Sequence, residues 1–434
     1  MIEPKINVGI MFQPAIRFNL DTLYSFEGNT YTGEYEVKIQ DGKILFAGKC
    51  YDEILFESDE NDSSFVLHDV VIGIGFHWER KEDQRFRGNL RFIVEDDHLT
   101  AINILFVEEY LKSVISSEMS ATSSKELLKA HAVISRSWLL YQTYKRTQIE
   151  SSSQNYVSDT KTENEWIKWW DREDHLNFDV CADDHCQRYQ GITRASQSLK
   201  MVEEAVEETR GELLMYDGII CDARFSKCCG GVVEEFQNCW EPVSYPYLTT
   251  LYDGDKNELR QIPDLTKEDE AEKWIRSAPA AYCNTKDKHI LNQVLNNYDQ
   301  ETTDFYRWKV SYSFAETASL IRRRIGLDLG EITNLIPRER GKSGRITKLE
   351  IQGTKDNLTI GKELLIRKAL SESHLYSSAF VVDKTNNGFI LTGAGWGHGV
   401  GLCQIGAAVM AEKGFQYRDI LAHYFPDSEL NQQY

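Results

Sequence analysis

The chain has 434 residues, of which 41% are hydrophobic and 27% are charged, and its formal net charge is −19. This composition is typical of a globular protein of two or three domains. The negative charge argues against nucleic acid or an anionic membrane surface as partner, because both attract basic patches. The sequence contains no apolar run of 18 residues, so we expect no transmembrane segment. No secretory signal pattern is visible at its N-terminus.

The first hundred residues are predicted to form β-structure. Hydrophobic and polar residues alternate over 35–39 and again over 44–46, and Asp41-Gly42 between them is typical of a hairpin turn. Further strands are expected at 65–76 and 90–94. Helical periodicity follows later in the chain, so we expect an α+β fold: a mixed, β-rich core with helices, preceded by an N-terminal β-rich region at residues 1–85.

Two helices are predicted in succession. Apolar residues recur at helical spacing over 107–119, and a second helix is expected to run to Arg146 after the capping-box pair Ser123 and Glu126. The polar stretch 147–164 is predicted to be a loop. Later elements are a charged insertion at 253–300 with a helix over 267–277, strands at 346–351 and 380–383, and a helix over 405–413.

Glu118 is a candidate general acid. It closes the first predicted helix, where the negative end of the helix dipole disfavours an ionised carboxylate. Apolar neighbours such as Ile115 and Met119 would also exclude water from it, and both effects suit proton donation. The alternative is an ordinary solvated glutamate at a helix end.

Arg136 lies among apolar residues on the second predicted helix. If its guanidinium is buried, it requires a carboxylate or another anionic partner. The alternative is that its side chain extends past the apolar surface to solvent.

The nine cysteines do not suggest a disulfide framework, because their number is odd and their spacing uneven. Four nitrogen and sulfur donors occur within twelve residues, and zinc prefers such a set: His175, Cys181, His185 and Cys186. The alternative is a set of unrelated loop residues. Cys228 and Cys229, which precede two glycines, are interpreted as small buried residues beside a turn.

A glycine-rich segment at 393–404 surrounds a single histidine, His398. Glycine lets the backbone turn sharply and approach a ligand or another part of the chain closely. We therefore predict that this loop presents the imidazole to a ligand. The alternative is a tight strand-to-helix turn with a surface imidazole.

Four blocks in fixed order resemble the stage II sporulation protein D family, which also includes the amidase-enhancer (LytB-type) proteins. They are 105–119 with 126–138, then 179–187, 223–231, and 393–404 continuing to 417–425. The resemblance covers about residues 85–427. It implies a catalytic domain at 86–427 with insertions near 147–164 and 253–300, and a tail at 428–434.

The resemblance implies a lytic transglycosylase that cleaves the β-1,4 bond between N-acetylmuramic acid and N-acetylglucosamine in peptidoglycan and leaves a 1,6-anhydro sugar. Glu118 would be the general acid and base, and Arg136 would orient Glu118 or a substrate carboxylate. Lys227, which is expected in the same cleft as Glu118, and His398 would be the other catalytic residues. Implied substrate-binding residues are Ser226, Trp396 and Gln404, and implied ligands of a structural zinc ion are His175, Cys181, Cys186 and, as fourth candidate, His185.

The resemblance further implies peptidoglycan glycan strands as substrate, a cell-wall amidase as a second partner, and a location outside the cytoplasm. The sequence departs from the family pattern at Ser226-Lys-Cys-Cys229, where the family usually has His-Ser-x-Ser, and at Cys403, where it has Ser, which puts substrate detail in doubt. Two other readings remain open. One is a non-catalytic amidase enhancer, and the other is a zinc hydrolase, which requires an open metal position beside a carboxylate.

Overall fold

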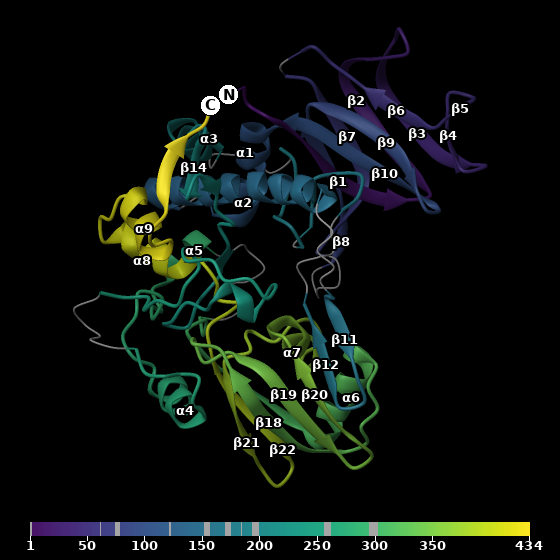
Figure 1. The fold of residues 1–434 in the computed structure, drawn as a ribbon. Coiled ribbons are helices and arrows are strands. Elements are labelled where there is room, and N and C mark those ends of the chain that lie inside the picture. The colour runs from purple at the N-terminus through teal and green to yellow at the C-terminus, as the bar shows by residue number, and fades with distance from the viewer. Residues whose placement is uncertain are drawn as a thin grey trace. The chain divides into compact units, whose positions relative to one another are not determined.

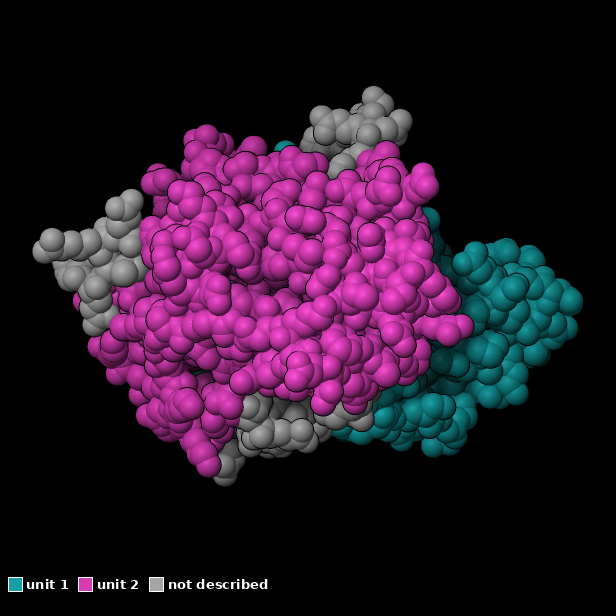
Figure 2. Space-filling view, turned by 90° about the horizontal axis from the view of Figure 1, so that it is seen from below, with its two compact units in different colours: residues 1–144, 175–213, 431–434 teal, residues 145–174, 214–430 magenta. Residues whose placement is uncertain are grey.

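The computed structural model describes residues 2–60, 62–73, 79–120, 123–151, 157–169, 175–183, 185–192, 199–255, 262–294 and 303–434. The regular elements described before residue 107 are all strands, and helices and strands are mixed after it, so the predicted α+β class with an N-terminal β-rich region is confirmed (Figure 1). Contacts divide the chain into two compact units, coloured separately in Figure 2. Unit 1 contains residues 1–144, 175–213 and 431–434, and unit 2 contains residues 145–174 and 214–430.

Unit 1 is built on two sheets. The first has the strand order β13 (Val180–Cys181), β1 (Lys5–Gln13), β10 (His98–Phe106), β9 (Asn89–Glu95) and β6 (Glu53–Phe56). The second has the order β5 (Lys49–Tyr51), β4 (Lys43–Phe46), β3 (Asn29–Gln40), β2 (Ala15–Phe26), β7 (Ser64–Ile72) and β8 (Arg80–Arg87).

Aromatic side chains join these two sheets. The ring of Phe18 on β2 lies 5.0 Å from that of Phe92 on β9, and the ring of Phe46 on β4 lies 5.3 Å from that of Phe56 on β6. All four are buried, because alternate residues of a strand point to the same face. The predicted hairpin is confirmed between β3 and β4, where Asp41 and Gly42 have φ angles of 52° and 73°.

Helix α1 (Val107–Glu118) continues directly from β10, and α2 (Lys125–Ser151) and α3 (Leu199–Glu208) follow. The apolar stripe of α1 is buried, as its periodicity predicts. The predicted loop at 147–164 is wrong at its start, where α2 continues to Ser151, and it also contains β11 (Asp159–Lys161). No proline or glycine interrupts the polar end of α2, so nothing there forces the helix to stop.

Unit 2 also contains two main sheets. One has the order β11, β12 (Glu165–Lys168), β20 (Asn357–Gly361), β19 (Ile346–Gly353) and β18 (Ile332–Arg340). The other has the order β17 (Arg307–Ser313), β22 (Gly388–Ala394) and β21 (Phe380–Lys384). The strands predicted at 346–351 and 380–383 are confirmed as β19 and β21.

Smaller elements complete the described structure. A two-stranded sheet pairs β16 (Phe225–Ser226) with β23 (Leu402–Cys403), and a three-stranded sheet has the order β15 (Ile219–Ile220), β14 (Glu212–Tyr216) and β24 (Glu429–Gln432). The remaining helices are α4 (Glu268–Ser277), α5 (Lys288–Val294), α6 (Phe314–Ile325), α7 (Glu363–Ala369), α8 (Gln404–Glu412) and α9 (Tyr417–Tyr424), with a 3₁₀ turn at Phe236–Asn238. Helices α4 and α8 confirm the predictions for 267–277 and 405–413. Among the described helices, none combines the length and apolar character needed to cross a bilayer.

Candidate active site and metal-binding clusters

Glu118 is the last residue of α1 and is half-buried. Its Oε1 accepts a hydrogen bond from the backbone N–H of Arg188, at 3.3 Å. Its helix neighbours Ile115 and Met119 are almost fully buried. The role of Glu118 as a proton donor stays a prediction.

The segment that supplies Arg188 is fixed to the core of unit 1 at several points. Its strand β13 pairs in parallel with β1, with Gly9 opposite Cys181. The backbone N–H of Gln190 donates to Ser113 Oγ on α1 at 3.3 Å. A side chain at Gly9 would meet the ring of Phe178 at 2.7 Å, so only glycine admits this close packing.

This segment also brings together the four predicted metal ligands. Cys186 Sγ lies 3.5 Å from His175 Nε2 and 3.5 Å from His185 Nδ1. Cys181 Sγ lies 3.9 Å from His185 Nδ1, and all four donor atoms lie within 4.8 Å of one another. Bond lengths of tetrahedral zinc place sulfur and nitrogen ligands about 3.5 Å apart. The cluster could therefore bind a metal ion.

The backbone explains how adjacent His185 and Cys186 reach one point. The N–H of Cys186 donates to the carbonyl of Asp183 at 3.1 Å, which forms a tight turn between the two cysteines. The N–H of Cys181 in turn donates to Cys186 Sγ at 3.4 Å. Hydrogen bonds from Cys186, and then from His175 and His185, lower the pKa of Cys181 to about 2 and favour the thiolate that a metal requires.

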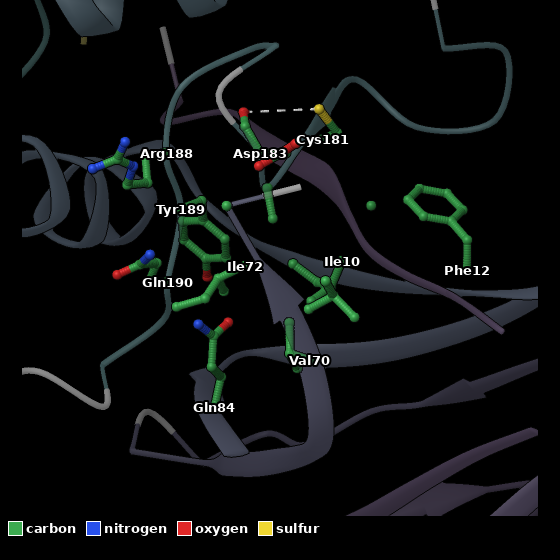
Figure 3. A pocket seen from close by; sticks show the side chains of 14 residues that line it. Ile10, Phe12, Val70, Ile72, Gln84, Cys181, Asp183, Arg188, Tyr189 and Gln190 are labelled. Carbon is green, nitrogen blue, oxygen red and sulfur yellow. Dashed lines mark hydrogen bonds between the residues drawn. The ribbon is translucent and has the colours of Figure 1, made fainter. Parts of the chain in front are cut away.

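A small pocket lies beside this segment. Figure 3 shows Cys181 and Asp183 at one end of it, and Val70 and Gln84 at the other. Arg188 belongs to the pocket lining, and its backbone N–H binds Glu118. The candidate acid, the pocket lining and the metal-binding cluster are thus connected through one short segment.

Arg136 on α2 has a structural partner. Its guanidinium is completely buried and donates to both carboxylate oxygens of Glu108, at 2.9 and 2.7 Å. Its third nitrogen donates to the carbonyl of Glu212 at 3.1 Å. Glu108 also accepts hydrogen bonds from Gly211 N and Tyr434 Oη. The alternative of a solvated arginine is therefore wrong, and the contacts assign Arg136 to the core of unit 1. Its predicted role in orienting Glu118 remains a prediction.

In unit 2, the blocks at 223–231 and 393–404 lie side by side. Strands β16 and β23 pair in parallel, with Ser226 opposite Cys403, and an isolated bridge joins Cys228 to Trp396. The structure thus brings five predicted site residues into two adjacent segments: Ser226, Lys227, Trp396, His398 and Gln404.

Most of these side chains contact protein groups. Lys227 Nζ donates to the carbonyl of Val294 at 2.6 Å, and the ring of Trp396 stacks on that of Phe305 at 4.7 Å. Gln404 is buried at the start of α8. Ser226 Oγ is buried with no hydrogen-bond partner in the described structure. Binding roles for these residues stay predictions.

The glycines of the 393–401 segment make room for arginines and backbone. Gly399 has a φ angle of 78°, and a side chain there would overlap the guanidinium of Arg345. Gly401 has a φ angle of 72°, and a side chain there would overlap the carbonyl of Arg224. Both positions require glycine because of protein contacts inside unit 2.

His398 is held within this loop. Its Nδ1 accepts a hydrogen bond from Val400 N at 3.0 Å, and its ring also bonds to the backbone of Phe225. Burial lowers the pKa of His398 well below its usual range, and the nearby Arg224 and Arg345 lower it further. A neutral imidazole thus links two backbone segments. Its presentation to a ligand stays a prediction.

A second cluster that could hold a metal ion lies in unit 2. It consists of Cys229, Asp253, Cys283 and Cys403, all buried, with their donor atoms within 4.8 Å of one another. The sequence predicts Cys229 to be a buried residue beside a turn, and it does not predict that Asp253, Cys283 and Cys403 lie next to it. Local spacing could not reveal the cluster, because its members come from four separate segments. The replacement of hydroxyl residues by cysteines at two of these positions was the available signal.

Arg136→Met is expected to lower the free energy of unfolding by about 3–5 kcal/mol, because it leaves Glu108 buried without its cation. Arg210→Met is a matched control in the same unit. The Arg210 side chain is 40% exposed, so losing its pairs with Glu3 and Glu207 should cost at most about 1 kcal/mol. Urea unfolding measures both values. Loss of activity with unchanged stability in Arg136→Met would contradict the structural assignment.

His398 should make stability depend on pH. Its folded pKa is depressed, so the unfolded state takes up a proton first as the pH falls below about 6.5. As the pH falls, the free energy of unfolding of wild type should then decrease by up to about 1.4 kcal/mol per pH unit more than that of His398→Asn. The amide oxygen of the asparagine can still accept the hydrogen bond from Val400 N. Urea unfolding of both proteins above and below this pH measures the difference. Parallel pH profiles would show that the imidazole is not held neutral.

Two family models match different parts of the chain. The model described as Stage II sporulation protein matches residues 95–216, which include Glu118, Arg136 and the His/Cys cluster. The model described as Domain of unknown function (DUF8618) matches residues 234–401, which include His398.

Several curated proteins are similar over most of the chain. An uncharacterized protein of Brachyspira hyodysenteriae is 29% identical over 78% of this chain and 70% of its own length. Stage II sporulation protein D of Bacillus subtilis is 23% identical over 75% of this chain and 74% of its own length. The Amidase enhancer of Bacillus subtilis is 25% identical over 74% of this chain and 40% of its own length. The chain therefore contains a stage II sporulation protein family domain and is distantly homologous to Stage II sporulation protein D and to the Amidase enhancer, as its motifs predict.

Proposed function

We propose that this protein is a peptidoglycan lytic transglycosylase. It cleaves the β-1,4 bond between N-acetylmuramic acid and N-acetylglucosamine and forms a 1,6-anhydro product, with Glu118 as general acid and base. The observation that carries the proposal is the half-buried carboxyl group of Glu118 at the end of α1, held by the N–H of Arg188. The family match over residues 95–216 supports it.

A single carboxyl group suffices for this reaction. Retaining and inverting hydrolases normally use two, one as acid and one as nucleophile or base. In the proposed reaction, Glu118 gives its proton to the bridging oxygen as the bond from C1 of N-acetylmuramic acid breaks. The 6-hydroxyl of the same sugar then attacks C1 and returns its proton to Glu118. No water is consumed.

The contacts of Glu118 suit both halves of this cycle. The apolar residues at the end of α1 limit solvent around the carboxyl group, which favours its protonated form before bond cleavage. The hydrogen bond from Arg188 N stabilises the carboxylate that remains after proton donation. Glu118 thus has a hydrogen-bond donor that suits its charged form.

We also propose that the His/Cys cluster holds a structural zinc ion. Two thiolates and two imidazoles form a closed tetrahedral donor set, which is typical of structural sites. When bound, zinc would fix the turn between Cys181 and Cys186 and thereby the position of Arg188. A zinc hydrolase would need an open metal position, which four protein ligands do not leave.

The substrate and location follow from the proposed reaction. Glycan strands of the cell wall would be the substrate, and the protein would act outside the cytoplasm. Its similarity to the Amidase enhancer of Bacillus subtilis makes a cell-wall amidase the second proposed partner.

A non-catalytic amidase enhancer is the second candidate function. Arg136 and His398, which the family resemblance makes catalytic, bind protein groups in this structure. A protein that only binds glycan or an amidase could keep such contacts. The products formed from purified cell wall separate the two functions.

Glu118→Gln should lower the release of anhydro sugars from peptide-free glycan strands by at least about 100-fold, because it removes proton transfer while keeping side-chain size. Mass spectrometry of the released sugars measures this. Glu109→Gln is the control on the same helix, since its partly exposed carboxylate pairs with Arg87 and Lys112. Equal product release by wild type and Glu118→Gln would refute the acid assignment. No release by wild type would favour the enhancer.

The double variant Cys181→Ser/Cys186→Ser should lose about one equivalent of zinc per chain and have a lower melting temperature, because zinc holds segments that little regular structure supports. Elemental analysis and calorimetry measure these changes. Cys50→Ser, at an exposed cysteine, is the control and should change neither. Unchanged zinc content in the double variant would contradict a zinc site here.

A further inference from the structure

The cluster of Cys229, Asp253, Cys283 and Cys403 lies in unit 2, apart in sequence from the His/Cys cluster of unit 1. Cys229 follows β16, Asp253 and Cys283 lie in irregular segments, and Cys403 ends β23. All four residues are at most 2% exposed. Four segments separated by up to 174 positions thus place one ligand atom each at a common point.

The spacing of the donor atoms matches a tetrahedral ion. Cys229 Sγ lies 3.6 Å from Cys283 Sγ and 3.3 Å from Asp253 Oδ2. For zinc, bond lengths of about 2.3 Å to sulfur and about 2.1 Å to oxygen place two sulfurs about 3.8 Å apart and a sulfur and an oxygen about 3.6 Å apart. For these two pairs, an expansion of a few tenths of an ångström would therefore reach the zinc geometry, and all four donor atoms lie within 4.8 Å of one another.

Outer hydrogen bonds already orient the ligand atoms. Tyr424 Oη donates to Asp253 Oδ1 at 2.6 Å, and Cys283 N donates to Oδ2 at 3.1 Å. Cys229 N donates to Cys403 Sγ at 3.2 Å. A side chain at Gly406 on α8 would overlap Tyr424 Oη, so glycine is required for this arrangement. Such partners are typical of ligands held ready for a metal.

The charge balance of the cluster also favours a cation. In the described structure, the side chains of these four residues bond to one another, to the neighbouring thiol of Cys228, to backbone N–H groups and to Tyr424. A carboxylate and thiolates shielded from water need a compensating positive charge, and without a cation these groups keep their protons. A divalent ion supplies that charge, and thiolates select zinc over harder ions.

We propose that Cys229, Asp253, Cys283 and Cys403 bind a second structural zinc ion. The ion joins the end of β23, which leads directly into α8, to the turn after β16 and to two irregular segments of unit 2. It stabilises the part of unit 2 where short strands and loops provide little continuous hydrogen bonding. The proposal does not depend on catalysis, because metal content is measured without substrate.

The test is the zinc content of the full chain, purified with a reductant and equilibrated with zinc before unbound metal is removed. Wild type should hold two zinc ions per chain. Cys181→Ser/Cys186→Ser and Cys283→Ser/Cys403→Ser should each hold one, and the fourfold variant none. Cys221→Ser/Cys239→Ser is the matched control, because it also removes two buried cysteines of unit 2 and should hold two. Two zinc ions in Cys283→Ser/Cys403→Ser would overturn the proposal.

A second measurement covers the case in which Cys283→Ser/Cys403→Ser fails to fold. Cobalt(II) is added to metal-free Cys181→Ser/Cys186→Ser, which keeps the unit 2 cluster intact. Thiolate-to-cobalt absorption in the near ultraviolet, displaced by one equivalent of zinc, is the expected result. Absence of that absorption would overturn the proposal.

Discussion

The position of Glu118 depends on one short segment of unit 1, from Val180 to Gln190. A carboxyl group at a helix end has few rigid neighbours, so its location is set by whatever packs against that end. Here this is the N–H of Arg188, and Arg188 is held by pairing of β13 with β1 and by the contact between Gln190 and α1. The two cysteines and two histidines lie within or next to the same segment. The same segment would therefore position both the candidate acid and a bound metal ion.

Both clusters that could bind metal occur where regular structure is sparse. In the described part of the 175–190 segment of unit 1 the only regular element is the two-residue strand β13, and the described part of 221–306 in unit 2 contains mostly short elements. Loops bury little apolar surface and lose much conformational entropy on folding. Bonds from side chains to an ion can offset that cost locally, as in small metal-dependent domains. Each proposed ion would thus stabilise a loop region, as the hydrophobic core stabilises the sheets.

Sequence patterns predicted what is local. The Asp41-Gly42 hairpin, helix α1 and helix α4 follow from turn chemistry and periodicity over neighbouring residues, and the His/Cys cluster follows from donors close in sequence. Partners far apart in the chain were not predictable. Nothing in the sequence indicated that Glu108 would pair with Arg136. The packing of Arg345 against Gly399 and the contact between Cys283 and Cys229 were equally unpredictable. The motif with most glycines was interpreted as facing a ligand, whereas two of its glycines admit protein groups.

The division of the chain has a consequence for folding. Unit 1 is assembled from three separate stretches, and residues 145–174 and 214–430 of the other unit interrupt it. During synthesis, the ribosome must therefore release nearly all of unit 2 before Tyr434 can reach the carboxylate of Glu108. The Glu108–Arg136 pair can form earlier, because both residues precede the first interruption. A nascent chain should then build most of the first unit before Tyr434 emerges and donates its hydrogen bond to Glu108.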